Sequence, residues 1–217
     1  IGGSDGAAKN LVESSLLAGK SVVTANKALI AHHGSALAAM AEKAGCVLAF
    51  EAAVAGGIPI VKSLREGLAG NNISKVYGIL NGTCNYILTK MESTEQEFGE
   101  VLREAQELGF AERDPSFDID GIDAAHKIAI LASIAFGCPV NFNSVHIEGI
   151  RHVKAMDISY ASELGYRIKL LAIAEASKGT VKQRVHPCLV PFNTPVAHVD
   201  GVFNAVVAEG DFVGHTV

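Results

Sequence analysis

Residues 21–50 read SVVTANKALIAHHGSALAAMAEKAGCVLAF, and this stretch predicts a strand, a helix and a second strand in succession. The apolar runs at residues 21–24 and 47–50 are short, which is typical of strands that are buried on both faces. Between them, apolar residues recur at helical spacing over residues 30–44. This order favours a parallel, doubly wound sheet.

The flanking segments fit the same interpretation. Upstream, residues 5–19 predict a helix that Gly19 ends, and residues 1–4 resemble the end of a buried strand that runs into a glycine loop. Downstream, the Gly/Ala-rich segment 51–59 predicts a turn that opens a helix near residues 59–68.

The pattern changes from about residue 74 onward. Val76, Gly78 and Leu80 alternate as in an antiparallel strand, and the final third mixes one helix with alternating strands. The expected elements are helices at 84–91, 94–109, 121–136 and 159–164, strands at 168–174 and 202–207, and an acidic loop at 110–120. We therefore predict an α/β fold: a partial Rossmann-like parallel sheet, then an α+β domain with a mainly antiparallel or mixed sheet. A boundary near residue 52 separates the parallel part from the α+β part.

Composition excludes several classes of protein. Of 217 residues, 49% are hydrophobic and 19% are charged, so the chain can bury a sizeable core and disorder is not expected. The net charge of −5 argues against a nucleic-acid-binding domain. The uncharged run at residues 128–147 is interrupted by Pro139 and is too short in its apolar part to span a membrane. Four scattered cysteines without a C-x-x-C pair suit a reducing cytoplasm.

The densest polar cluster lies just before and within the helix predicted at 121–136. It consists of Glu112, Asp114, Asp118, Asp120, Asp123 and Lys127. One interpretation is structural: Asp120 caps the helix, Asp123 completes a capping box, and Asp123 with Lys127 forms a surface ion pair. The other is functional, because the rest of this helix is almost wholly apolar and therefore buried. A lysine held at the mouth of a buried helix can donate a proton to a carbonyl oxygen, and the carboxylates can hold an ammonium group.

Three further segments are candidates for chemistry. Lys27 follows the strand at 21–24, at the sheet edge where ligands of α/β proteins bind, although a solvated lysine at a helix start is the simpler interpretation. Turn 51–59 can point carbonyls at a cation, although an ordinary turn is more common. The segment 78–86 places an Asn-Gly-Thr sequence at a helix start, where backbone N–H groups bind anions. Cys84 has no nearby histidine that would activate it as a nucleophile.

Together, four strings resemble the homoserine dehydrogenase family. They are VVTANKALIA (22–31), EAAVAGGIPIV (51–61), GILNGTCNYIL (78–88) and LGFAERDPSFDIDGIDAAHKIAIL (108–131). The resemblance covers essentially the whole chain, with the motifs in the family's order and at family-like spacing. It implies three parts: residues 1–51, the end of a nucleotide-binding domain; 52–180, a catalytic domain; and 181–217, further strands of its sheet. It implies a cytoplasmic oxidoreductase that interconverts L-aspartate 4-semialdehyde and L-homoserine with NAD(P)H, on the route to threonine, methionine and isoleucine.

The resemblance also implies roles for single residues. Lys127 donates the proton to the aldehyde oxygen, and Asp123 orients it or serves the substrate. Lys27 touches both the substrate and the nicotinamide side of the cofactor, which is NADP or NAD. The remaining implied substrate contacts are Glu112, Asp118, Gly82 and Thr83.

Two further implied sites lie in the first third of the chain. Gly2 and Gly3 belong to a loop that passes the cofactor, and Glu51, Val54, Gly56 and Ile58 form a monovalent-cation site, commonly for sodium, built largely from main-chain carbonyls. The family forms dimers, so the implied partners are the small-molecule substrate and a second copy of the chain.

The chain departs from the family in two ways. The G-x-G-x-x-G phosphate loop is absent, so we expect a fragment that lacks the first half of the Rossmann domain and the end that follows residue 217. We expect such a fragment to bind cofactor poorly and to be inactive alone. Cys84 stands where threonine is usual, a small change. The alternative function is a non-catalytic or regulatory paralogue, against which the retained lysines and acids argue.

Overall fold

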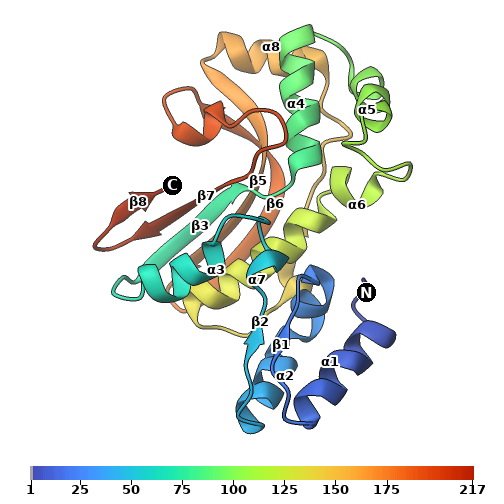
Figure 1. Cartoon of the computed structure of the whole chain (residues 1–217). Helices are drawn as coiled ribbons and strands as arrows, with labels where there is room; N and C mark the ends of the chain where they lie inside the picture. Colours follow the sequence, from blue (N-terminus) through green and yellow to red (C-terminus); the bar gives the residue numbers. More distant parts are fainter. Residues whose placement is uncertain (1) are drawn as a thin grey trace.

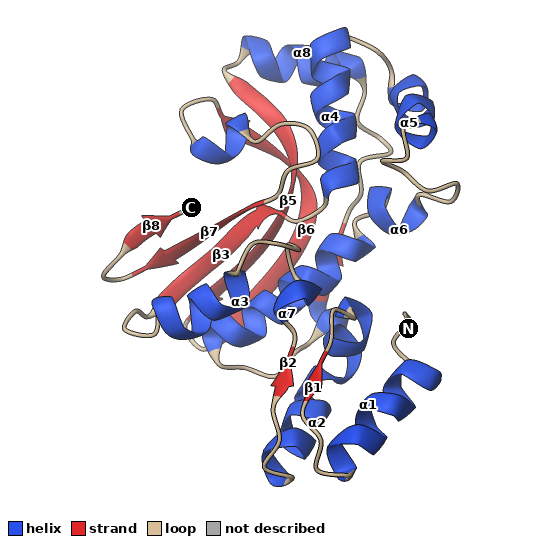
Figure 2. Ribbon diagram, in the orientation of Figure 1, coloured by secondary structure: helices blue, strands red, loops and turns tan. Residues whose placement is uncertain are grey.

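A computed structural model describes residues 2–217, which form a small parallel α/β unit and a larger mixed-sheet unit (Figures 1 and 2). The strand end predicted at residues 1–4 falls partly on Ile1, which lies outside the described residues. Residues 3–5 form a bend rather than a strand.

The small unit holds a two-stranded parallel sheet and two helices. Its elements are α1 (Ala7–Leu17), β1 (Val22–Val23), α2 (Lys27–Lys43) and β2 (Leu48–Ala49). Helix α2 begins three residues earlier than periodicity predicted, because the Asn26 side chain accepts a hydrogen bond from the backbone N–H of Leu29 at 3.1 Å and caps the helix. Val12, Leu16 and Leu37 pack between the helices, so this unit has a small core of its own.

The larger unit is built on a six-stranded sheet in the order β4-β6-β5-β3-β7-β8. Its strands are β3 (Ile73–Ile79), β4 (Val145–Ile147), β5 (Tyr166–Ser177), β6 (Thr180–Pro191), β7 (Ala205–Gly210) and β8 (Gly214–Thr216). Within this sheet, as far as residues 2–217 describe it, only β4 and β6 pair in parallel. Strands β5 and β6 form a long hairpin in which Tyr166 faces Pro191. The predicted fold class is confirmed.

Helices pack on the sheet and place the main core on one of its faces (Figure 2). The helices of this unit are α3 (Ile60–Lys62), which continues as the π-helix η2 (Ser63–Gly67), α4 (Gly82–Thr94), α5 (Phe98–Glu107), α6 (Ser116–Ile119), α7 (Ile122–Phe136) and α8 (Ala155–Glu163). Short 3-10 turns are η1 (Glu51–Ala53), η3 (Phe142–Ser144) and η4 (Pro195–His198). Helix α7 runs under β3, β5 and β6, and α2 packs against its outer side, so α7 joins the two units.

The capping prediction for α7 is wrong. Gly121, with a φ of 85°, occupies the N-cap position, and no side chain caps the helix. Asp120 instead forms an ion pair with Arg151 through both carboxylate oxygens. Gly149 packs directly against the backbone of Ile119 and Asp120, at the turn between α6 and α7. The Asp120 side chain is exposed at this turn. The acidic loop predicted at residues 110–120 contains α6, and the strand predicted at 202–207 begins at Ala205.

The six-stranded sheet takes strands from both sides of residue 180, so residues 52–217 share one sheet. The finer division into three parts stays a prediction. Among residues 2–217, no helix is long and apolar enough to cross a membrane.

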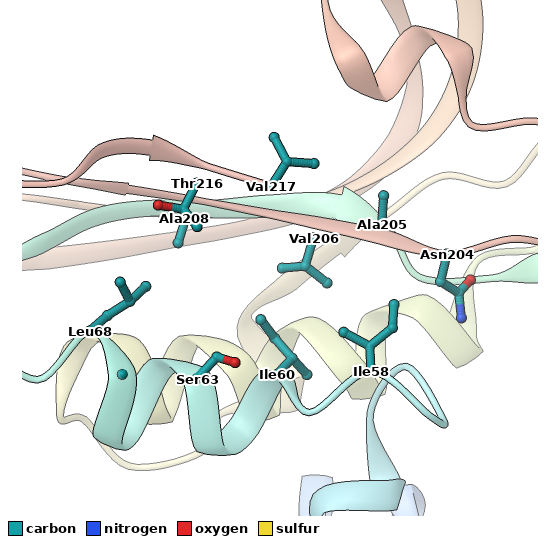
Figure 3. A pocket seen from close by; sticks show the side chains of 11 residues that line it. Ile58, Ile60, Ser63, Leu68, Asn204, Ala205, Val206, Ala208, Thr216 and Val217 are labelled. Carbon is teal, nitrogen blue, oxygen red and sulfur yellow. The ribbon is translucent and has the colours of Figure 1, made fainter.

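An apolar cavity of about 520 Å³ lies between the α3–η2 helix and strands β7 and β8 (Figure 3). Its lining consists of Ile58, Ile60, Ser63, Gly67, Leu68, Asn204, Ala205, Val206, Ala208, Thr216 and Val217. None of these residues is charged, so the candidate chemistry lies elsewhere.

Candidate active site

Asp123 binds two lysines with one carboxylate. Lys27 Nζ lies 3.0 Å from Oδ1, and Lys127 Nζ lies 2.7 Å from Oδ2. Lys127 stands one turn further along α7, whereas Lys27 is the first residue of α2 in the other unit. The Asp123 side chain is only 4% exposed and that of Lys27 is 36% exposed, so the two units meet at a charged triad centred on a buried carboxylate.

Lys127 has a second partner. Its Nζ donates to the backbone carbonyl of Leu80 at 2.6 Å, just after β3. A lysine ammonium has three hydrogens. With two directed at Asp123 and Leu80, the third can reach an oxygen that enters from the cleft.

Asn81 is a site residue that the sequence interpretation did not select. Its amide nitrogen donates to Asp118 Oδ1 and to Asp123 Oδ2, both at 2.8 Å. Its amide oxygen accepts from the backbone N–H of Cys84 at 2.8 Å and so caps α4. The available signal was the Asn at a helix start, which predicts a cap. The bridge between two distant aspartates needed the fold.

The two aspartates have opposite pKa shifts. Burial raises the pKa of Asp123, but the nearby ammonium groups of Lys127 and Lys27 and the Asn81 hydrogen bond outweigh it, so the pKa falls below its usual value. Burial also raises the pKa of Asp118, and there the Asn81 hydrogen bond does not fully compensate. Asp123 is therefore firmly anionic, and Asp118 is the carboxylate that gains most from an added cation.

These groups open onto a cleft of about 390 Å³. Its lining consists of Lys27, Asn81, Gly82, Thr83, Gly109, Phe110, Asp118, Asp123, Lys127 and Val202. Six predicted site residues therefore lie together: Lys27, Gly82, Thr83, Asp118, Asp123 and Lys127. Thr83 Oγ1 donates to the carbonyl of Phe110 at 2.8 Å, which fixes the α5–α6 loop over the cleft. Glu112 is exposed and does not line the cleft, so its assigned role stays a prediction.

A second hollow, of about 680 Å³, lies at the carboxyl end of β1. It is lined by Gly2, Gly3, Val23, Thr24, Ala25, Asn26, Lys27, Ala28 and Phe117. The Asn26 side chain donates to the carbonyl of Gly3 at 2.7 Å, and a Cβ at Gly2 or Gly3 would meet no atom within 4 Å. The backbone there is open to a ligand, and the position is the strand edge where nucleotides bind in such sheets. Lys27 lines both this hollow and the cleft, with its Nζ 5.7 Å from the centre of the Phe117 ring.

Residues 51–59, which the family resemblance assigns to a monovalent-cation site, form a tight turn beside α3. The Glu51 carboxylate accepts from the backbone N–H groups of Val61 at 2.8 Å and Lys62 at 2.9 Å, so it caps α3. Ala55 and Gly56 both have a φ of 56°, which reverses the chain between Val54 and Ile58. In the described part of the chain, no group of three or more His, Cys, Asp or Glu side chains could hold a metal. A cation site here depends on carbonyl oxygens and stays a prediction.

Cys84 is unsuited to nucleophilic chemistry. Its thiol is buried, it donates to the carbonyl of Asp118 at 3.2 Å, and burial raises its pKa well above the usual value. It is a packing residue under the α6 segment.

The structure thus defines a two-domain α/β protein in which a parallel unit of nucleotide-binding type meets a mixed-sheet domain at a lysine–aspartate site. Comparison with known proteins gives the same division. The family description "Homoserine dehydrogenase, NAD binding domain" matches residues 2–51, and "Homoserine dehydrogenase" matches residues 59–217. The chain belongs to the homoserine dehydrogenase family.

Individual relatives agree over nearly all of the chain. A homoserine dehydrogenase of Neisseria gonorrhoeae is 51% identical over 99% of this chain and 49% of its own length. The crystal structure of a homoserine dehydrogenase from Thiobacillus denitrificans is 52% identical, with a TM-score of 0.97, over 100% of this chain and 50% of that one. A hyperthermophilic archaeal homoserine dehydrogenase in complex with NADPH is 35% identical, with a TM-score of 0.82, over 96% of this chain and 60% of its own. The chain spans about half the length of the curated relatives it matches.

Proposed function

We propose that the native protein containing this chain interconverts L-aspartate 4-semialdehyde and L-homoserine with NADP or NAD. The observation that carries the proposal is the triad of Lys27, Asp123 and Lys127. It stands where the polar cleft meets the hollow at the end of β1, and Lys27 lines both. This arrangement suits a reaction between a small polar substrate and a cofactor held in adjoining spaces.

The cleft carries a group for each charge of the substrate. Asp118 holds the substrate ammonium group. The positive charge of that group stabilises the ionised Asp118 carboxylate, which burial disfavours. Gly82 and Thr83 form the first turn of α4, whose N–H groups have no partner within the helix and can bind the substrate carboxylate. Glu112 approaches the ammonium end only if the loop that carries it moves inward.

Lys127 acts on the reacting carbonyl. When bound, the nicotinamide supplies or accepts the hydride. Lys127 gives a proton to the substrate oxygen during reduction and takes it back during oxidation. Asp123 orients Lys127 through their ion pair, while the Leu80 carbonyl fixes its position. Lys27 holds the same carboxylate from the cofactor side and so aligns the two spaces.

The residues present fit the cofactor and can accommodate a cation. Gly2, Gly3 and Lys27 would hold the nicotinamide side of the cofactor, as the open backbone at the two glycines supports. We also infer that carbonyl oxygens of Glu51, Val54, Gly56 and Ile58 bind a monovalent cation, with sodium the expected ion. The left-handed conformation of Ala55 and Gly56 supports this, because a tight turn of this kind can direct several carbonyl oxygens to one point.

We further infer a homodimer. The exposed apolar side chains beside β8, Phe212 at 90% and Val213 at 39%, support an interface between two copies. Analytical ultracentrifugation of the native protein should give twice the monomer mass, and a monomer at every concentration contradicts the dimer. The four free cysteines support a cytoplasmic location.

The test is reduction of NADP or NAD by the native protein with L-homoserine. Lys127→Ala should lower kcat by about 10²- to 10⁴-fold, the usual size of a general acid–base contribution, with cofactor affinity nearly unchanged. Lys9→Ala, at a partly exposed pair with Glu13 on α1, is the control and should keep the native rate. Native turnover by Lys127→Ala contradicts its role. A folded native protein without activity on either cofactor favours a non-catalytic paralogue.

A further inference from the structure

The loop between β6 and β7, residues 194–204, forms one wall of the cleft. Val202 lines the cleft beside Gly82, and their backbones are in close approach: a Cβ added to Gly82 would lie 2.7 Å from the Val202 carbonyl oxygen. The position of this loop therefore sets the width of the cleft at the first turn of α4.

A buried lysine holds the loop from the other side. Lys169 lies in β5 with its side chain 1% exposed and does not line the cleft. Its Nζ donates to the carbonyl of Val199 at 2.8 Å, to Asp200 Oδ1 at 3.1 Å and to Asn85 Oδ1 at 3.2 Å. All three ammonium hydrogens are thus used, two of them on the loop.

Arg167 and Asn85, which lie near Lys169, also hydrogen-bond to the 194–204 loop. Arg167 donates through Nη1 to the carbonyl of Ala197 and to Asp200, both at 2.9 Å. Asn85, in α4, donates to the carbonyls of Val199 at 2.9 Å and Phe203 at 3.2 Å. Lys169 orients Asn85 through its amide oxygen, so it acts on both ends of the 199–203 segment.

The fold does not by itself require a charge at this position. Burial lowers the pKa of Lys169, although Asp200 favours the charged form, so the ammonium is held against its desolvation cost. A methionine fills a similar volume without that cost. The neighbours of Lys169 on the same face of β5, Leu171 and Ile173, are apolar. A role in placing the loop accounts for the charge.

We propose that Lys169 is a positioning residue for substrate binding: it fixes the 194–204 loop against the first turn of α4 and so shapes the substrate end of the cleft. The inference rests on the proposed function for its kinetic consequence, but the attachment of the loop can be tested without activity. Lys27, Asp123 and Lys127 lie on other elements, so the chemical step should be affected far less than binding.

The experiment compares Lys169→Met with Arg184→Met in the native protein. Arg184 lies on β6 and pairs with Glu175 away from the loop, so it is a matched control for loss of a charge from the same sheet. Lys169→Met should raise KM for L-homoserine about 10- to 100-fold, the effect of losing charged hydrogen bonds, with kcat and cofactor KM within about threefold. An unchanged KM, or a fall in kcat alone, overturns the proposal.

Hydrogen exchange separates this inference from the proposed function. The amide of Gly201 donates to Thr89 Oγ1 at 3.3 Å, and it should exchange at least tenfold faster in Lys169→Met than in Arg184→Met. Equal exchange overturns the proposal even if the native protein is active. Faster exchange in a protein without homoserine activity supports the attachment and contradicts the proposed function. If Lys169→Met does not fold, Asp200→Asn, at a half-exposed position, should show the same KM and exchange changes.

Discussion

Asp123 shows why one carboxylate can organise a site. It accepts from Lys27, Lys127 and Asn81, three residues that come from three different elements. Because the carboxylate is buried, the loss of its charge leaves two ammonium groups without a counter-ion close by. Because Asp123 is buried, its ion pairs with Lys27 and Lys127 contribute to the stability of the fold as well as to the proposed catalysis.

Asp123→Asn keeps the shape of the side chain and removes that charge. We expect the free energy of unfolding to fall by about 3 kcal/mol, as when one partner of a buried ion pair is removed. The measurement is urea denaturation at pH 7. Asp120→Asn, which breaks the exposed pair with Arg151, should cost less than about 1 kcal/mol. Similar losses in the two variants contradict the central place of Asp123.

His126 makes the protein sensitive to acid. It is 4% exposed, its ring lies 5.3 Å from that of His32 and 4.4 Å from that of Phe142, and its Nδ1 has no hydrogen-bond partner. Burial, together with the charges of His32 and Lys27, lowers its pKa from 6.5 to about 4. The unfolded chain therefore binds this proton more readily than the folded one. The stabilisation is complete above pH 6.5 and is lost as the pH falls towards 4.

Between pH 7 and pH 4.5, this one group should lower the free energy of unfolding by about 2 to 3 kcal/mol. His126→Phe removes the titration and keeps an aromatic ring, so its stability should vary less over that range. His152→Phe, at an exposed position, should follow the wild-type profile. Parallel profiles for wild type and His126→Phe contradict the assignment.

Some residues of the candidate site could be predicted from the sequence alone. The spacing of Asp123 and Lys127 predicted a shared helix face, which the structure shows as an ion pair. Local spacing could not show that Lys27 reaches the same carboxylate or that Asn81 bridges to Asp118, because those contacts join distant parts of the chain. The sheet-edge position made Lys27 a candidate and the acidic cluster contained Asp118, but the family resemblance was needed to assign both residues to one site.

Among the elements, the link between α6 and α7 depends on a close approach of backbones. Residues 149–151 pass directly beneath it, and the N–H of Ile150 donates to the carbonyl of Ile119 at 2.8 Å. Asp118 and Asp123 lie on either side of this link. Its conformation therefore decides how far apart the two carboxylates stand.

Gly149→Ala tests that approach. An added Cβ would lie 2.2 Å from the Ile119 carbonyl oxygen and 2.5 Å from Asp120 Cα, so backbone must move. We expect the free energy of unfolding to fall by about 3 kcal/mol, with a loss of homoserine activity. Gly99→Ala, in α5 with no atom within 4 Å of the added Cβ, should instead stabilise by about 0.5–1 kcal/mol. Urea denaturation of both variants gives the comparison.

Element types were easier to predict than their ends. Apolar periodicity predicted α1, α2 and α7 because each buries one stripe or, for α7, nearly all of its surface. The start of α7 was predicted from Asp120 as a cap. That failed because Arg151, far along the chain, competes for the same carboxylate. The short α6 has too few residues to show any period.

For the molecule as a whole, the two units differ in how their strands are supported. β1 and β2 pair only with each other among the described residues, and Val23 is 85% exposed. β5 is paired on both sides and covered by α7. The small unit is joined to the larger one mainly through α2 on α7, the same contact that brings Lys27 to Asp123.

This difference predicts that the chain opens in two steps. The small unit has its own limited core around Leu16 and Leu37, whereas α7 and the large sheet share the main core. Native-state hydrogen exchange should therefore show the amides of Val22 and Thr24, which bond to β2 and its flank, exchanging at least 100-fold faster than that of Ala172 in β5. Opening of the small unit withdraws Lys27 from Asp123, so Asp123→Asn should speed exchange at Val22 more than at Ala172. Equal protection at all three amides would mean that the α2–α7 contact couples the units into one cooperative structure.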